Sequence, residues 1–199
     1  MGNCDAIAER QRLKSVEIAK FGLNMVALPP RFSDVQNHWA RLFIEGLAQR
    51  GIISGFPDGT FQPDSPMTRA QYAAVLQKAF SRPKKRPNVP FTDVPTNHWA
   101  VAAIRQAYET GFISGYPGNL FRPDASIARV EALVSLTSGL DITLDPTSDI
   151  KTKLPELYDD ANQIPNYAID RIAAATELEL VVNYPNLKLL KPSGVATRA

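Results

Sequence analysis

Two stretches of the chain carry the same order of apolar, polar and turn-forming residues, 60 positions apart. The matching pairs are Trp39 with Trp99, Gly51 with Gly111, Gly55 with Gly115, Phe61 with Phe121, Pro63 with Pro123, and Arg69 with Arg129. Self-similarity over this many landmarks is the signature of a tandem repeat. We therefore predict one repeat over residues 31–80 and a second over residues 91–140.

The first half of each repeat predicts a helix. Apolar side chains recur at helical spacing over residues 39–47, and Asn37 just ahead of them suits a helix N-cap. Gly51 follows as a left-handed stop. The second repeat carries the same signals over residues 97–111, so the same helix is predicted there.

A turn-rich loop and a second helix complete the unit. Gly55, Asp58 and Gly59 belong to a tight turn, because glycine permits backbone angles that other residues avoid. Thr68 and Gln71 have the spacing of a capping box at the start of a helix. The pattern therefore predicts a mainly α fold of helix-loop-helix repeats with very short extended segments.

A third and more divergent copy occupies residues 158–199. Asp160 takes the place of the aspartate at the start of the other repeats, and Tyr167 takes the place of the tryptophan. Near the end, the run Thr197, Arg198, Ala199 matches the run that opens the second helix of the first repeat. We expect this third repeat to lack its second helix.

Three segments lie outside the repeats. Residues 1–30 predict a helix from about residue 5 to residue 20, followed by a stiff entry at two prolines. Residues 81–90, with three prolines and four basic residues, and residues 141–157 predict linkers. We hypothesise that the N-terminal helix packs where the third repeat lacks its helix, because exposed apolar faces invite association.

Charge and cysteine content exclude several classes of protein. The chain has 22 basic and 20 acidic side chains, so no global field attracts nucleic acid. Lys84, Lys85 and Arg86 form a small basic cluster that we interpret as part of a solvated linker. A single cysteine rules out an internal disulfide and a cysteine-rich metal site. No apolar run reaches the roughly 20 residues that span a bilayer, and no signal peptide is visible.

The repeated polar and aromatic residues favour structural roles over catalysis. The sequence holds no nucleophile elbow, phosphate-binding loop or zinc-protease motif, and we predict neither catalysis nor a cofactor. His38 and His98 occupy one position in two repeats, which favours a cap or surface hydrogen bond over a metal site. Trp39 and Trp99 are predicted to lie mostly in the core. Structural roles are also assigned to Gly51, Gly111, Gly55, Gly115, Asp34 and Asp93.

The repeats resemble the modules of the S-layer homology family. The first repeat carries the family's Phe-x-Asp-Val opening at residues 32–35, its His-Trp-Ala at residues 38–40, its Gly-Phe-Pro-Asp-Gly loop at residues 55–59 and its Thr-Arg-Ala at residues 68–70. The second repeat departs at Gly118 and Ala128, and the third at the tryptophan and at both loop glycines. The third unit is similar to variants found in cyanobacterial envelope proteins.

The resemblance implies non-covalent attachment to the cell wall and a location in the cell envelope. In that family, three modules form a pseudo-threefold domain whose grooves bind an acidic or pyruvylated polysaccharide linked to peptidoglycan. The arginine of the Thr-Arg-Ala motif is a main ligand contact. The candidate ligand-binding residues are therefore Arg69, Arg129 and Arg198, with Asp58, Thr68 and Gln71. A monomer or weak self-association is expected.

The physical chemistry of the arginines leaves two interpretations open. Arg69 and Arg129 lie in the first turn of a helix, where the helix dipole disfavours a cation by roughly a few tenths of a kcal/mol. The compensating partner is either internal, such as a salt bridge to Asp34 or Asp93, or an anionic sugar. The alternative function is a non-enzymatic helical repeat scaffold for protein assembly. A third class, a wall hydrolase fragment, would require turnover of peptidoglycan, which we do not expect.

Overall fold

The computed structural model describes residues 31–199, which are mainly helical. The helices are α2 (Arg41–Gln49), α3 (Arg69–Ala79), α4 (Val101–Glu109), α5 (Arg129–Gly139), α6 (Ile150–Leu157) and α7 (Ile169–Glu177), with the 3-10 turns η1 (Ala161–Gln163) and η2 (Asn166–Ala168). Pairing between extended segments in this range is limited to isolated bridges. The predicted mainly α, three-repeat fold is confirmed. The predicted helix over residues 5–20 lies outside the described residues.

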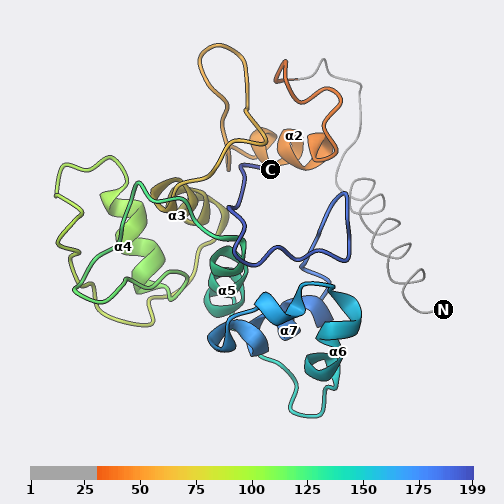
Figure 1. The fold of residues 1–199 in the computed structure, drawn as a ribbon. Helices are drawn as coiled ribbons and strands as arrows, with labels where there is room; N and C mark the ends of the chain where they lie inside the picture. Colours follow the sequence, from red (N-terminus) through yellow and green to blue (C-terminus); the bar gives the residue numbers. More distant parts are fainter. Residues whose placement is uncertain (1–30) are drawn as a thin grey trace.

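The second helix of a repeat packs on the first helix of the next repeat. Helix α3 contacts α4, and α5 contacts α7. Three lobes, formed by the α2 region, by α4, and by α6 with α7, surround the middle of the molecule (Figure 1). The core of the second repeat therefore includes α3 of the first repeat, and the core of the third includes α5 of the second. The core around α2 is formed by residues of the first repeat alone. Within the described residues of the third repeat, no helix follows α7.

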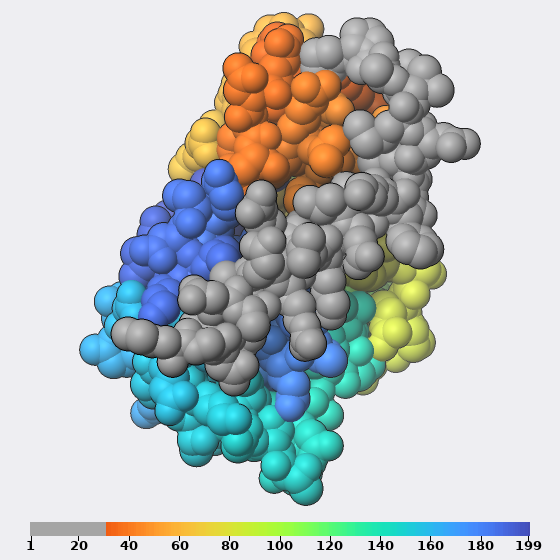
Figure 2. All heavy atoms as spheres, turned by 90° about the vertical axis from the view of Figure 1, so that its right-hand side faces the viewer, coloured from red at the N-terminus to blue at the C-terminus, as the bar shows by residue number. Residues whose placement is uncertain are grey.

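A closed ring of backbone hydrogen bonds joins the three repeats at their centre. The Met67 N–H donates to the Ala196 carbonyl at 2.9 Å, the Ala196 N–H to the Ile127 carbonyl at 2.9 Å, and the Ile127 N–H to the Met67 carbonyl at 3.0 Å. These residues occupy equivalent positions in the three repeats. The C-terminal segment therefore lies against the first repeat, as Figures 1 and 2 also show.

The aspartate at the start of each repeat holds the end of that repeat's loop. The Asp34 carboxylate accepts the backbone N–H groups of Phe61 and Gln62 at 2.8 and 2.7 Å. The same pair of bonds joins Asp93 to Phe121 and Arg122, and Asp160 to Leu190 and Lys191. The pKa of Asp34 lies below its usual value, because these donors outweigh the opposing effect of desolvation.

The first helix of each of the first two repeats begins at a later residue than the sequence predicts. Helix α2 starts at Arg41, and its N-cap is Ala40, not Asn37. The imidazole of His38 supplies the local acceptor, since its Nδ1 lies 3.1 Å from the Ala40 backbone N–H. His98 makes the same contact in the second repeat. The predicted cap or surface hydrogen bond of these histidines agrees with this geometry.

The glycines of the first repeat and the N-cap of its second helix have the structures that the sequence predicts. Gly51 adopts φ +71°, the left-handed conformation that ends the helix. At Gly55 an added Cβ would lie 2.4 Å from the Phe32 ring, so a side chain has no room there. Thr68 Oγ1 accepts the Gln71 N–H at 3.2 Å, and Gln71 Oε1 accepts the Thr68 N–H at 3.0 Å. This is the predicted capping box.

The segments predicted as linkers have more structure than expected. Residues 150–157 form α6, and Leu154 is buried against α7. The sequence pattern predicts a linker here because the stretch is polar and contains a proline. A single buried leucine does not produce the recurring apolar positions from which a helix is predicted. The basic cluster is also not a solvated linker: Arg86 donates to the Tyr108 and Ile113 carbonyls at 2.7 and 2.8 Å.

Helix α2 carries larger apolar side chains than its counterpart α4. Phe43 and Leu47 are 41% and 36% exposed, whereas Ala103 and Ala107 are buried where α3 packs on α4. The two pairs are equivalent in the repeat. The first repeat therefore presents an apolar helix face within the described structure.

Candidate ligand-binding grooves

The arginine of each Thr-Arg-Ala run binds backbone carbonyls of the next repeat. Arg69 Nε donates to the Phe121 carbonyl at 2.8 Å, and its Nη2 donates to the Ser114 carbonyl at 3.0 Å. Arg198 makes the same two bonds to the first repeat, with Phe61 at 2.9 Å and Ser54 at 3.0 Å. The guanidinium groups therefore link the repeats in a circle.

Arg129 closes the remaining interface in a similar way. Its Nε donates to the Leu190 carbonyl at 3.0 Å, and its Nη2 donates to Asn183 Oδ1 at 2.7 Å. Burial lowers the pKa of Arg129 and of Arg198. The internal partners of the arginines are thus mainly carbonyls. Within the described residues, the salt bridge to Asp34 or Asp93 that was one of the two open interpretations is not formed, and Arg69 instead lies 3.7 Å from a carboxylate oxygen of Glu131.

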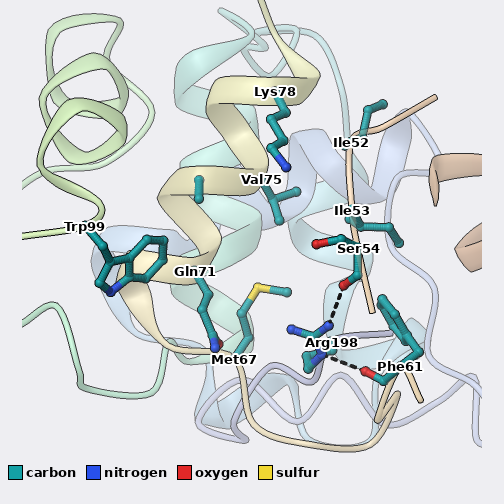
Figure 3. Close-up of a pocket in the computed structure, with 11 residues that line it drawn as sticks. Ile52, Ile53, Ser54, Phe61, Met67, Gln71, Val75, Lys78, Trp99 and Arg198 are labelled. Carbon is teal, nitrogen blue, oxygen red and sulfur yellow. Dashed lines mark hydrogen bonds between the residues drawn. The ribbon is translucent and has the colours of Figure 1, made fainter. Parts of the chain in front are cut away.

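A groove beside α3, which we call groove A, has a volume of about 200 Å³. Its walls come from the first-repeat loop, the exposed side of α3, the start of the second repeat and the C-terminal segment (Figure 3). The lining residues are Ile52, Ile53, Ser54, Phe61, Met67, Gln71, Ala74, Val75, Lys78, Trp99 and Arg198. All three repeats therefore contribute to one concave surface.

A second groove, groove B, has a volume of about 350 Å³ beside α5. Its lining matches groove A one repeat later: Arg69 stands for Arg198, and Tyr167 stands for Trp99. The lining residues are Arg69, Gly111, Phe112, Ile113, Ser114, Gly115, Tyr116, Ile127, Glu131, Val134, Ser135, Ser138 and Tyr167. The pseudo-threefold arrangement thus builds the same type of groove twice.

The structure distributes the predicted ligand-binding residues unevenly. Arg198 and Gln71 line groove A, and Arg69 lines groove B. Arg129 and Thr68 line neither of these two grooves. Asp58 is exposed in its turn, where it accepts the Thr60 N–H at 2.9 Å and the Thr60 hydroxyl at 2.7 Å. Hydrogen bonding to Thr60 lowers the pKa of Asp58.

The tryptophans do not lie in the core. Trp39 is 41% and Trp99 is 65% exposed, because both lie in the turn before a helix, where the following alanine takes the buried position. Trp99 lines groove A. Trp39 instead stacks on Tyr184, with ring centroids 5.2 Å apart. The apolar pattern alone could not distinguish these positions from core positions.

Lys78 also lines groove A, although the sequence pattern does not single it out. Its side chain extends from the last turn of α3 and lies at the opposite end of the groove from Arg198 (Figure 3). A lysine near a helix C-terminus is normally read as a favourable partner for the helix dipole. Lys78 belongs to a groove only because segments distant in the sequence form the other walls.

Comparison with known proteins agrees with this architecture. The model of the S-layer homology domain matches residues 31–73, 90–133 and 157–199. The chain belongs to the S-layer homology family. Its three tandem modules account for more than half of the sequence.

Several relatives of this S-layer homology protein are larger surface proteins or enzymes. A cellulosome-anchoring protein of Acetivibrio thermocellus is 37% identical over 55% of this chain, which covers 26% of that protein. An exoglucanase, XynX, of the same species is 32% identical over 84% of the chain, covering 15% of the enzyme. S-layer protein EA1 of Bacillus anthracis is 28% identical over 64% of the chain, covering 15% of that protein.

The chain spans about a quarter or less of these relatives. Within residues 31–199, no group of His, Cys, Asp and Glu side chains is arranged to hold a metal ion. None of the helices described there is long and apolar enough to cross a bilayer.

Proposed function

We propose that this three-module domain attaches non-covalently to the bacterial cell wall, by binding a polysaccharide linked to peptidoglycan, and so anchors or positions envelope material. Groove A carries the proposal, since it combines an exposed indole, an apolar floor and two cationic side chains. Concave sites of this composition hold a ligand by apolar contact and fix it with a few polar groups. A location in the cell envelope follows from this function.

The relatives support attachment as the function of this part of the chain. One is named for anchoring a cellulosome and another for forming an S-layer. The exoglucanase shares this stretch over 15% of its length, which leaves room for a catalytic part elsewhere in that enzyme. We therefore propose a binding module without catalysis or cofactor.

The apolar face of α2 supports a second candidate, a helical scaffold for protein assembly. Leu42, Phe43 and Leu47 are exposed on one short helix. Exposed apolar patches commonly mark protein contacts. On this alternative, the arginines serve only to join the repeats.

Binding to isolated cell walls tests the proposal. Purified protein is sedimented with native peptidoglycan sacculi from the organism that encodes this chain, and with sacculi stripped of their attached polysaccharide by acid. We expect co-sedimentation with the native sacculi alone. Equal binding to both would point to peptidoglycan itself as the ligand. Binding to neither would remove the proposed function and favour the scaffold.

A further inference from the structure

The first helices of the second and third repeats are each covered by a helix of the preceding repeat. Helix α3 packs on α4, and α5 packs on α7. Ala107 of α4 and Ala175 of α7 occupy equivalent positions and are buried. Leu47 takes this position in α2, where it is exposed together with Phe43 on the same side of the helix. Within residues 31–199, no helix packs on α2 as α3 packs on α4.

The loop of the third repeat presents a second uncovered apolar surface. Leu180 is 43% exposed, whereas its equivalent in the second repeat, Phe112, is buried against α5 of its own repeat. Val182 is 45% exposed and takes the position that Ser54 and Ser114 hold in the first two repeats. The third loop is therefore more apolar than the loops that line grooves A and B.

These two apolar surfaces flank one position of the pseudo-threefold arrangement. In the second repeat, α5 packs against Phe112 of its own loop and on α7 of the next repeat. The corresponding position for the third repeat lies between its loop and α2 of the first repeat. The stacking of Trp39, just before α2, on Tyr184 of the third loop brings the two surfaces together. We define this position, the helix seat, by the side chains of Phe43, Leu47, Leu180 and Val182.

The segment that precedes the described structure is long enough to reach the helix seat. The structure describes the chain from Arg31 onwards, and the Arg31 guanidinium donates to the Ala48 carbonyl in the last turn of α2 at 2.9 Å. The preceding segment therefore joins the described structure beside α2. The helix predicted from about residue 5 to residue 20 would be about 24 Å long, against about 16 Å for α3. Residues 21–30 can span up to about 33 Å.

The predicted helix over residues 5–20 has apolar side chains on two sides. At about 3.6 residues per turn, Leu13 and Val16 lie on one side, and Ile7 and Ile18 lie on the opposite side. A helix on the surface of a domain needs only one apolar side, because the other side faces water. The helix seat has two apolar walls, one from α2 and one from the third-repeat loop. The sequence pattern of residues 5–20 therefore suits the helix seat.

We propose that residues 5–20 form a helix that fills the helix seat and covers α2, as α3 covers α4. The helix seat is then an intramolecular docking surface for the N-terminal segment. Apolar faces that remain exposed favour association, and this contact removes one of them. The scaffold alternative would lose the α2 surface on which it rests. The inference does not depend on wall binding.

A charge placed on the predicted helix of the full-length chain tests the proposal. Val16→Asp puts a carboxylate on one of its apolar sides. Ser15→Asp is the matched control, because it adds the same charge at the neighbouring polar position, and valine, serine and aspartate have similar helix propensities. Hydrogen exchange is measured by mass spectrometry over α2 and over residues 178–184. Sedimentation equilibrium measures the mass of each protein in solution.

We expect Val16→Asp to raise exchange about tenfold in α2 and in residues 178–184, and to lower the melting temperature by about 4–8 °C. Ser15→Asp should match the wild type, and both should be monomers. Leu47→Asp should act on the same contact, so its effect combined with Val16→Asp should be smaller than the sum of the two single effects.

Two results would overturn the inference, whether or not the protein binds sacculi. The first is unchanged exchange in Val16→Asp or strictly additive effects of Val16→Asp and Leu47→Asp, because residues 5–20 would then not contact α2. The second is a dimeric wild type whose protection of α2 is lost on dilution, because a second copy of the chain would then fill the helix seat.

Discussion

At the scale of single residues, the chain uses side chains to satisfy backbone groups of a neighbouring loop. Arg69 illustrates this, because it is nearly fully buried and donates to two carbonyls of the second repeat. Asp34 does the reverse within its own repeat and accepts two N–H groups. Buried polar backbone groups that lose such partners cost about 1–3 kcal/mol each. These residues are therefore expected to affect stability before they affect binding.

Replacing Arg69 with alanine should destabilise the protein. The substitution leaves the Phe121 and Ser114 carbonyls without their donor and removes the ion pair with Glu131, which we expect to cost about 3 kcal/mol. For a chain of this size that is roughly a 6–12 °C fall in melting temperature, measured by calorimetry. Arg50→Ala, at an exposed position beyond α2, is the control and should change stability by less than about 0.5 kcal/mol. An unchanged melting temperature for Arg69→Ala would contradict a structural role.

The lowered pKa of Asp34 predicts acid sensitivity. The folded protein holds this carboxylate ionised below its ordinary pKa of 3.8, so its stabilising effect is complete above that value and is lost as the pH falls through the folded pKa. Asp34→Asn should be less stable than the wild type at pH 7, and the difference should shrink below about pH 4. Urea unfolding at a series of pH values measures this. A constant difference across the series would refute the assignment.

At the scale of elements, each helix-loop-helix unit is encoded locally, but its loop depends on close approach. In the first two repeats, the loop glycine lies against the ring of the phenylalanine that opens the repeat. The second helices have different caps: Thr68 accepts a backbone N–H, whereas Ala128 has no side-chain oxygen and Glu131 alone bonds back to the cap. The units therefore share a backbone while differing in local stability.

Two glycine-to-alanine substitutions should have opposite effects. At Gly115 a Cβ would lie 2.3 Å from the Phe91 ring and 2.9 Å from the Leu120 carbonyl, so Gly115→Ala should destabilise by about 2 kcal/mol or more. Gly46 lies inside α2, with its nearest neighbour 3.8 Å from an added Cβ. Gly46→Ala should therefore stabilise by about 0.5–1 kcal/mol. Chemical denaturation of both variants tests the pair, and a destabilised Gly46→Ala would count against this view of α2.

The second repeat should accept a better cap. Ala128 already has the extended backbone of an N-cap, with φ −75° and ψ 151°. Ala128→Thr adds the oxygen that Thr68 supplies in the first repeat and should stabilise the protein by about 1 kcal/mol. The melting temperature measures this gain. Thr68→Ala is the reciprocal variant and should lower the stability of the protein by a similar amount. If both variants are less stable than the wild type, the two caps are not equivalent.

At the scale of the whole molecule, contacts between the C-terminal segment and the first repeat close the repeats into a ring. The Ala196 backbone joins the central hydrogen bonds, and Arg198 binds the Ser54 and Phe61 carbonyls. The two Arg198 contacts link residues that are 137 and 144 positions apart in the sequence. The same closure places Arg198 in groove A and so couples the stability of the first repeat to the candidate site.

Removing residues 195–199 should release the first repeat from the ring. Hydrogen exchange measured by mass spectrometry should rise over residues 52–68, which lose the Arg198 and Ala196 contacts. Helix α7 packs on α5 and α6 and should retain its protection. Equal loss of protection throughout, or none in the first repeat, would show that the ring does not hold the lobes in this way.

The sequence by itself determined the repeats, the capping box at Thr68, the left-handed glycines and the match of Asp160 to Asp34, because these depend on local chain geometry that residue type encodes. Tertiary structure alone decided the exposure of Trp99, the burial of Leu154, the carbonyl partners of the arginines and the charge of groove A. Each of these depends on which repeat lies beside which. A periodic pattern predicts which side chains lie on one face of a helix. Which segment packs against that face is decided only when distant parts of the chain fold together.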